Sequence, residues 1–159
     1  MMYREIKVDL FGMPSNYILV HCISSDFAMG AGIAKDFRDK YRIKAALCNK
    51  YDQDEWYGHG YCHIVTHPSS PWAVANLVTK KKYSDKPTYT TLKEALLSFK
   101  GQLLQRYPDI SDEGENPMLH IAMPLIGCGL DRLDWPQVSD MVKRVFKDLN
   151  IEVVVCRRD

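Results

Sequence analysis

The sequence predicts a three-layer α/β/α sandwich built around a mixed central sheet. β-rich runs and amphipathic helical patterns alternate along the chain, as they do in such folds. Residues 17–23 form a continuous apolar run, which is typical of a strand buried on both faces, and residues 151–156 are also expected to be a buried strand. Glycine-rich loops at residues 29–34 and 126–133 each follow an expected strand and precede an expected helix. These loops indicate where a ligand binds in such a sheet.

The N-terminal part predicts two strands and a helix. Residues 3–8 alternate in a way that suits a short strand, which runs into a turn at Asp-Leu-Phe-Gly. The apolar strand over residues 17–23 follows, and Ser and Asp then lead into the first glycine loop. After this loop, Ile33, Phe37 and Tyr41 recur at helical spacing.

A strand pair and a long helix are expected in the middle of the chain. Residues 61–65 and 72–78 are β-rich and are separated by HPSSP, whose composition favours a turn. They therefore form a hairpin or neighbouring strands. A helix follows Pro87 over residues 88–107. Its apolar face consists of Leu92, Leu96, Phe99 and Leu103.

The C-terminal part predicts a loop, two strands and a helix. Residues 107–117 are acidic and carry Pro and Gly, so a loop is expected there, and residues 118–123 form the next strand. The last helix is expected over residues 135–149, because Pro136 suits its first turn. The strand over residues 151–156 closes the chain.

Length and composition indicate one ordinary domain covering residues 1–159. The 46% hydrophobic and 26% charged residues are close to the average for globular proteins. A net charge of +1 gives no global field that draws a protein onto nucleic acid. No signal peptide and no run of the ~20 apolar residues that span a bilayer is found. We therefore expect no membrane association, an intracellular location in cytoplasm or nucleus, and a monomer.

Metal binding and disulfides are not expected. The five cysteines are odd in number and scattered, and none belongs to a CxxC pair. His59, His63 and His67 recur every fourth residue, but in a stretch that predicts a loop followed by a strand, where this spacing does not gather ligands. His21, within an apolar strand, is expected to be a hydrogen-bonded core histidine.

The two glycine loops are candidate phosphate sites. Exposed backbone N–H groups at a helix N-terminus bind phosphate, and two such loops could hold two phosphates. Neither loop matches a Walker A motif or the GxGxxG dinucleotide fingerprint. The alternative is that the glycines only supply tight turns between strand and helix. Cys128 between two glycines is expected to fill space in its loop and not to act as a nucleophile.

Lys80 and Asp131 are candidate catalytic residues. Lys80, Lys81 and Lys82 follow an apolar strand, and a lysine crowded by cations loses affinity for its proton and becomes a nucleophile. The alternative for these lysines is a solvated surface. Asp131, in the second glycine loop, either faces a reacting sugar or is a turn residue before the helix.

Four sequence blocks resemble the macrodomains, and among them the terminal ADP-ribose protein glycohydrolase branch. They are VDLF at residues 8–11, HCIS with MGAGIA at 21–34, TKK with KPTY at 79–89, and MPLIGCGLDRLDW at 123–135. The blocks follow the family order and cover nearly the whole chain. The resemblance implies that Lys80 takes the position of the nucleophile and Asp131 that of the acid/base.

The resemblance also implies an ADP-ribose site. Asp9 would accept a hydrogen bond from the adenine amino group, Leu10 would adjoin the ring, and the glycine loops would wrap the diphosphate and distal ribose. The implied contacts are Asp9, Leu10, Met29, Gly30, Ala31, Gly32, Ile33, Ala34, Thr79, Pro124, Ile126, Gly127, Cys128, Gly129 and Leu130.

The expected function is a hydrolase of ADP-ribosylated carboxylates, nucleobases or O-acyl-ADP-ribose, without metal or cofactor. Its partners are ADP-ribose and ADP-ribosylated protein, nucleic acid or metabolite. Lys80 would attack the anomeric carbon, and Asp131 would shuttle protons. Two alternatives stay open: a phosphatase or deacylase that uses bound water, acting for example on ADP-ribose 1″-phosphate, and a non-catalytic ADP-ribose reader.

Overall fold

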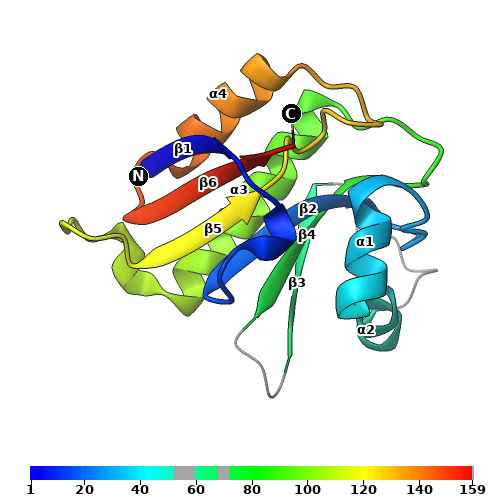
Figure 1. Ribbon diagram of the computed structural model, residues 1–159, viewed down its shortest axis with the longest axis horizontal. Helices are drawn as coiled ribbons and strands as arrows, with labels where there is room; N and C mark the ends of the chain where they lie inside the picture. The colour runs from blue at the N-terminus through cyan, green and yellow to red at the C-terminus, as the bar shows by residue number, and fades with distance from the viewer. Residues whose placement is uncertain (52–59, 68–71, 159) are drawn as a thin grey trace.

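The computed structural model describes residues 1–51, 60–67 and 72–158, and contains a six-stranded mixed sheet (Figure 1). The strand order is β1-β6-β5-β2-β4-β3; the β3–β4 pair is antiparallel, and the other neighbouring pairs are parallel. The strands are β1 (Met2–Lys7), β2 (Tyr17–Ser24), β3 (Tyr61–Thr66), β4 (Ala73–Lys80), β5 (Leu119–Met123) and β6 (Ile151–Arg157).

Helices cover both faces of this sheet, which confirms the predicted three-layer sandwich. The long helix α3 (Tyr89–Arg106) and α4 (Trp135–Phe146) pack on one face. The other face carries α1 (Gly32–Tyr41), α2 (Ile43–Lys50) and the short 3-10 helix η1 (Leu10–Gly12). Within the described part of the chain, no helix has the length and apolar character needed to cross a membrane.

Strand β6 contributes side chains to both cores. Val153 and Val155 point into the core beneath α3 and α4, whereas Val154 and Cys156 point into the core beneath α1. All four are buried, as expected for a buried strand. The face of α3 is also as predicted, and its first turn is closed by a capping box at Thr88.

Some expected boundaries differ from the structure. Helix α2 was not predicted: Arg42 adopts a left-handed conformation with φ of 52° and separates α2 from α1. Helix α4 ends at Phe146, three residues before the expected end. The expected loop at 107–117 contains a 3-10 helix, η2 (Pro108–Ser111), whose Ile110 is buried. The pairing of β3 with β4 is confirmed, while most of the connecting turn lies outside the described residues.

Candidate active site

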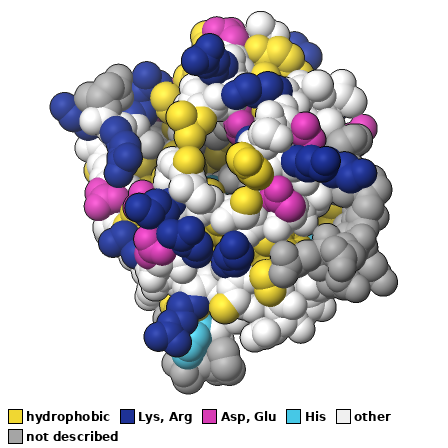
Figure 2. Space-filling view, turned by 90° about the vertical axis from the view of Figure 1, so that its right-hand side faces the viewer, with side chains coloured by type: hydrophobic (Ala, Val, Ile, Leu, Met, Phe, Trp, Pro, Cys, Tyr) yellow, Lys and Arg dark blue, Asp and Glu magenta, His cyan; other side chains and the backbone are white. Residues whose placement is uncertain are grey.

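A cavity of about 960 Å³ lies where β2, β4, β5 and β6 end, and its size is within the range of small-molecule sites. Both glycine loops line it, as the strand-end rule predicts. On the side of the molecule shown in Figure 2, hydrophobic side chains lie among Lys and Arg side chains around a central hollow. The expected contacts that line the cavity are Met29, Gly30, Ala31, Gly32, Ile33, Ala34, Lys80, Pro124, Ile126, Gly127, Cys128, Gly129, Leu130 and Asp131.

A β-bulge at the end of β4 places Lys80 in this cavity. Ile23 of β2 pairs with Val78, but the next residue, Ser24, pairs with Lys80. Thr79 is therefore an extra residue on β4, and it is buried. A bulge changes the direction of the side chain that follows it, and both Lys80 and Ser24 line the cavity. The sequence placed Lys80 just after the strand, whereas the structure makes it the last residue of β4.

Lys80 and Asp131 form an ion pair inside the cavity. Lys80 Nζ donates to Asp131 Oδ1 at 2.8 Å, and the two side chains are only 15% and 16% exposed. The ion-pair partner of Lys80 is thus a carboxylate. The next two residues, Lys81 and Lys82, are exposed and are not among the described residues that line the cavity. The sequence suggested crowding by cations and did not reveal that Lys80 is paired with a carboxylate.

The second glycine loop is folded tightly enough to fix Asp131. Gly127 has a φ of +72°, which favours glycine, and a β-carbon there would lie 3.0 Å from Leu133 Cδ1. The loop is closed by a hydrogen bond of 2.8 Å from Leu133 N to Gly127 O. The residue after Asp131, Arg132, has a φ of +62°. These constraints hold the Asp131 carboxylate against Lys80.

The first glycine loop presents the N-terminus of α1 to the cavity. The N-cap residue Ala31 makes no side-chain hydrogen bond to the first turn, so the backbone N–H groups there have no side-chain cap. Gly32 has a φ of +60°, and the cavity is lined by residues on both sides of it. Helix N-termini with free N–H groups bind anions. This loop has the geometry of a phosphate site.

Asp26 fastens the segment after Lys80 to the first glycine loop. Its carboxylate accepts hydrogen bonds from Ser24 Oγ at 2.5 Å, Ala28 N at 3.1 Å and Tyr83 N at 3.0 Å. Burial acts to raise the pKa of Asp26, but these hydrogen bonds outweigh it and hold the pKa below its usual value. Lys86 Nζ donates to Leu130 O at 3.2 Å and so links the same segment to the second loop.

Three expected contacts do not line the cavity. Asp9 caps η1 by accepting from Phe11 N at 3.0 Å, and Leu10 is buried in the core. Asp9 nevertheless lies close enough to act electrostatically on Cys156, which does line the cavity. Thr79 is the buried bulge residue. The prediction missed several lining residues, of which the strand-end rule could have identified Ser24 and Arg158. The others are Cys22, Ile23, Ala28, Tyr83, Lys86, Leu125 and Cys156.

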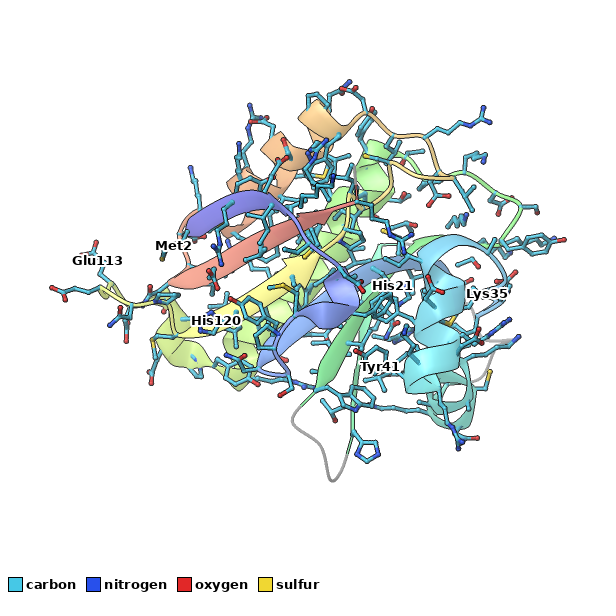
Figure 3. The ribbon with its side chains drawn as sticks, viewed as in Figure 1. Met2, His21, Lys35, Tyr41, Glu113 and His120 are labelled. Atoms are coloured by element: carbon cyan, nitrogen blue, oxygen red, sulfur yellow. The ribbon has the colours of Figure 1, made fainter. Side chains whose placement is uncertain are left out.

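His21 is a buried, hydrogen-bonded histidine, as expected, and two cysteines at the cavity have raised pKa values. Burial, with a smaller effect from Asp134, raises the pKa of the Cys128 thiol to about 11, so it is no thiolate at neutral pH. Burial likewise raises the pKa of Cys22. His21 lies between the sheet and α1 (Figure 3), with Nε2 2.6 Å from Asn76 Oδ1. His63 and His67 contact aromatic rings, and His59 lies outside the described residues.

Comparison with known proteins identifies the family. No protein-family model matches the sequence. The chain is 36% identical over 150 residues to the ADP-ribose glycohydrolase OARD1 of Homo sapiens and of Bos taurus, covering 94% of this chain and 88% of each relative. The macrodomain of Thermus aquaticus DarG shares its fold, with a TM-score of 0.75 and 22% identity over 98% of this chain and 97% of that one.

The structure of Thermosipho africanus DarTG in complex with ADP-ribose also shares the fold. It gives a TM-score of 0.71 at 18% identity, covering 98% of this chain and 41% of that one. At these identities the two structures establish the fold, and the OARD1 match establishes the branch. The chain therefore belongs to the macrodomain family, in the branch of the terminal ADP-ribose glycohydrolases.

Proposed function

We propose that this macrodomain binds ADP-ribose in its cavity and hydrolyses the bond between the distal ribose and an acceptor. The observation that carries the proposal is the 2.8 Å contact between Lys80 Nζ and Asp131 Oδ1 inside the cavity. An amine and a carboxylate in contact form a nucleophile with its own proton acceptor. The OARD1 relatives are named ADP-ribose glycohydrolases, and the DarTG structure is a complex with ADP-ribose, which supports the same ligand here.

In the proposed binding mode the ligand runs along the strand ends. Lys80 ends β4, Cys156 lies near the end of β6 and Arg158 follows it, with β2 and β5 between these two strands. Three strand spacings amount to about 14 Å, which suits an extended dinucleotide-like ligand. The distal ribose lies at Lys80, the diphosphate lies between the glycine loops, and the adenine lies toward Asp9. Backbone N–H groups of the loops would hold the phosphates, because the described cavity has only a few cations.

The proposed reaction begins with proton transfer from Lys80 Nζ to Asp131. The neutral amine attacks the anomeric carbon, and the bond from that carbon to the acceptor oxygen breaks, so the acceptor leaves as a carboxylate with the electron pair. Asp131 then gives its proton to the ring oxygen as the ribose ring opens and takes one from the attacking nitrogen, which leaves a lysyl iminium adduct. Asp131 releases that proton to solvent and is again a carboxylate.

Water completes the cycle. It adds to the same carbon while Asp131 takes its proton, the carbon–nitrogen bond breaks, and the Lys80 amine regains a proton. The ring closes to ADP-ribose. One water is consumed for each ADP-ribose and acceptor carboxylate released. The same attack applies to O-acyl-ADP-ribose esters at the anomeric position and, with a protonated leaving group, to nucleobase acceptors.

The test compares turnover with binding. Release of ADP-ribose from glutamate-ADP-ribosylated protein is measured for wild type, Lys80→Ala, Asp131→Asn and the control Lys82→Ala, whose lysine is exposed outside the cavity lining. Calorimetry gives the ADP-ribose affinity of all four proteins. We expect turnover to fall by about 10²-fold or more in the first two variants, with binding largely kept.

The other outcomes identify different functions. Turnover that survives Lys80→Ala would contradict the lysine nucleophile and favour a water-based hydrolase, for which ADP-ribose 1″-phosphate is the next substrate to assay. Tight binding of ADP-ribose by wild type with no turnover of protein, nucleic-acid or ester substrates would indicate a reader.

A further inference from the structure

Two large hydrophobic side chains are exposed at the cavity. Tyr83 is 71% exposed and Leu130 is 64% exposed, and both line the cavity. The other exposed large hydrophobic residues of the described chain do not line it. Exposed apolar groups at the edge of a pocket often mark a contact with a ligand. The proposed catalytic pair does not require either side chain.

Both residues lie at the end of the cavity where the bond would break. Leu130 directly precedes Asp131, and Tyr83 is in the segment that follows Lys80 at the end of β4. The opposite end, at Cys156 and Arg158, is three strands away. A ligand with its distal ribose at Lys80 would direct the group attached to that ribose toward Tyr83 and Leu130.

Both segments are held in place before any ligand binds. Tyr83 N donates to Asp26 Oδ2 at 3.0 Å, and Leu130 O accepts from Lys86 Nζ at 3.2 Å. The Leu130 side chain also approaches Gly32, where a β-carbon would lie 3.3 Å from its Cδ1. Because these backbone segments are already ordered, they lose little conformational entropy when a ligand binds.

We propose that Tyr83 and Leu130 form the acceptor subsite, and that they select acceptors with an aromatic or bulky apolar group next to the ribosyl bond. This inference rests on the proposed function. The tyrosine ring offers a face for stacking, and Leu130 offers apolar surface. An acceptor with a small group, such as acetate, reaches neither side chain and gains nothing from them.

The experiment compares two esters that differ only in the acyl group, 1″-O-benzoyl-ADP-ribose and 1″-O-acetyl-ADP-ribose. Each is hydrolysed by one water to ADP-ribose and a carboxylate, and the readout is the ratio of the two kcat/KM values. We expect wild type to prefer the benzoyl ester by about fivefold, after correction for the uncatalysed rates. Tyr83→Ala and Leu130→Ala should each reduce this preference, and Tyr83→Phe, which keeps the ring, should retain it.

Matched controls are available on α3 and just after it. Leu97 and Tyr107 are 46% and 44% exposed and do not line the cavity, so Leu97→Ala and Tyr107→Ala should leave the ratio unchanged. A wild-type ratio of one or less, or an unchanged ratio in Tyr83→Ala, overturns the subsite.

Binding separates failure of the subsite from failure of the proposed function. Dissociation constants of both esters are measured on Lys80→Ala with and without Tyr83→Ala. If Lys80→Ala binds the benzoyl ester more tightly and Tyr83→Ala removes this preference, the subsite is supported. If wild type hydrolyses neither ester, the hydrolase is rejected, whatever the binding result. Equal affinities for the two esters on Lys80→Ala, despite hydrolysis by wild type, would reject the subsite alone.

Discussion

Lowering the pH from 7 to 5 is expected to reduce the free energy of unfolding through His21. This side chain is fully buried, stacks on Phe37 with 3.9 Å between ring centroids, and pairs with Asn76 through Nε2. Its Nδ1 has no hydrogen-bond partner among the described residues. Burial lowers the pKa of His21 to about 4, against an opposing effect of the Asn76 hydrogen bond.

The sign follows from which state binds the proton first. The unfolded chain takes up a proton near pH 6.5, whereas the folded protein does so only near pH 4, so stability falls as the pH falls through this interval. At pH 5 the loss from His21 is about 2 kcal/mol. Carboxylates with lowered pKa values, such as Asp26 and Glu152, lose their contribution at lower pH, as they become protonated. His63, whose pKa burial also lowers to about 4, adds a loss in the same interval.

Urea unfolding of wild type and His21→Gln at pH 7, 6 and 5 tests this prediction. Glutamine can still pair with Asn76 but does not titrate, so the variant should lose about 2 kcal/mol less than wild type between pH 7 and 5. Leu97→Gln, which changes an exposed side chain of α3 that does not titrate, should keep the wild-type pH dependence. The same pH dependence in wild type and His21→Gln would refute the reasoning.

Three further predictions concern the loops and the reaction. Gly127→Ala puts a β-carbon at a φ of +72° and 3.0 Å from Leu133. It should lower the free energy of unfolding in urea by about 1–3 kcal/mol and reduce turnover. The control Gly101→Ala, on α3 with open space around it, should raise the free energy of unfolding by about 0.5–1 kcal/mol. Asp26→Ala removes three hydrogen bonds that hold the segment after Lys80 to the first glycine loop. The variant should be cleaved faster after Lys81 and Lys82 in limited proteolysis and should have a lower kcat/KM. An unchanged rate of cleavage would contradict this role of Asp26. EDTA should leave turnover unchanged, because the proposed nucleophile is an amine, and loss of turnover that added Mg²⁺ restores would contradict the proposed route.

The sequence predicted the layers of the fold better than its boundaries. Strong patterns, such as the apolar run of β2 and the repeated leucines of α3, predicted elements that the structure contains. Helix α2 escaped prediction because it buries only Ile43 and Leu47, and because its separation from α1 depends on a left-handed Arg42. Nothing in the sequence around Arg42 signals that conformation, since left-handed arginine is uncommon.

The loops that form the site were predicted from the sequence, but the positions of the side chains within it were not. The glycine loops and the strand-end rule located the cavity, and the family resemblance selected Lys80 and Asp131. The bulge at Thr79 could not be predicted, because an inserted residue does not disturb composition and only register reveals it. The proposed acceptor contacts of Tyr83 and Leu130 were also out of reach, since the positions of their segments depend on tertiary hydrogen bonds with Asp26 and Lys86.

The most direct test of the Lys80 nucleophile is to trap its adduct. Wild type is mixed with glutamate-ADP-ribosylated protein in the presence of borohydride, which supplies the hydride that reduces an iminium to a stable amine, and the digested chain is analysed by mass spectrometry. The mechanism predicts an ADP-ribose-derived adduct on Lys80, absent in Lys80→Ala and retained on Lys80 in Lys82→Ala. Turnover without any adduct on Lys80, or adducts spread equally over Lys81 and Lys82, would contradict it.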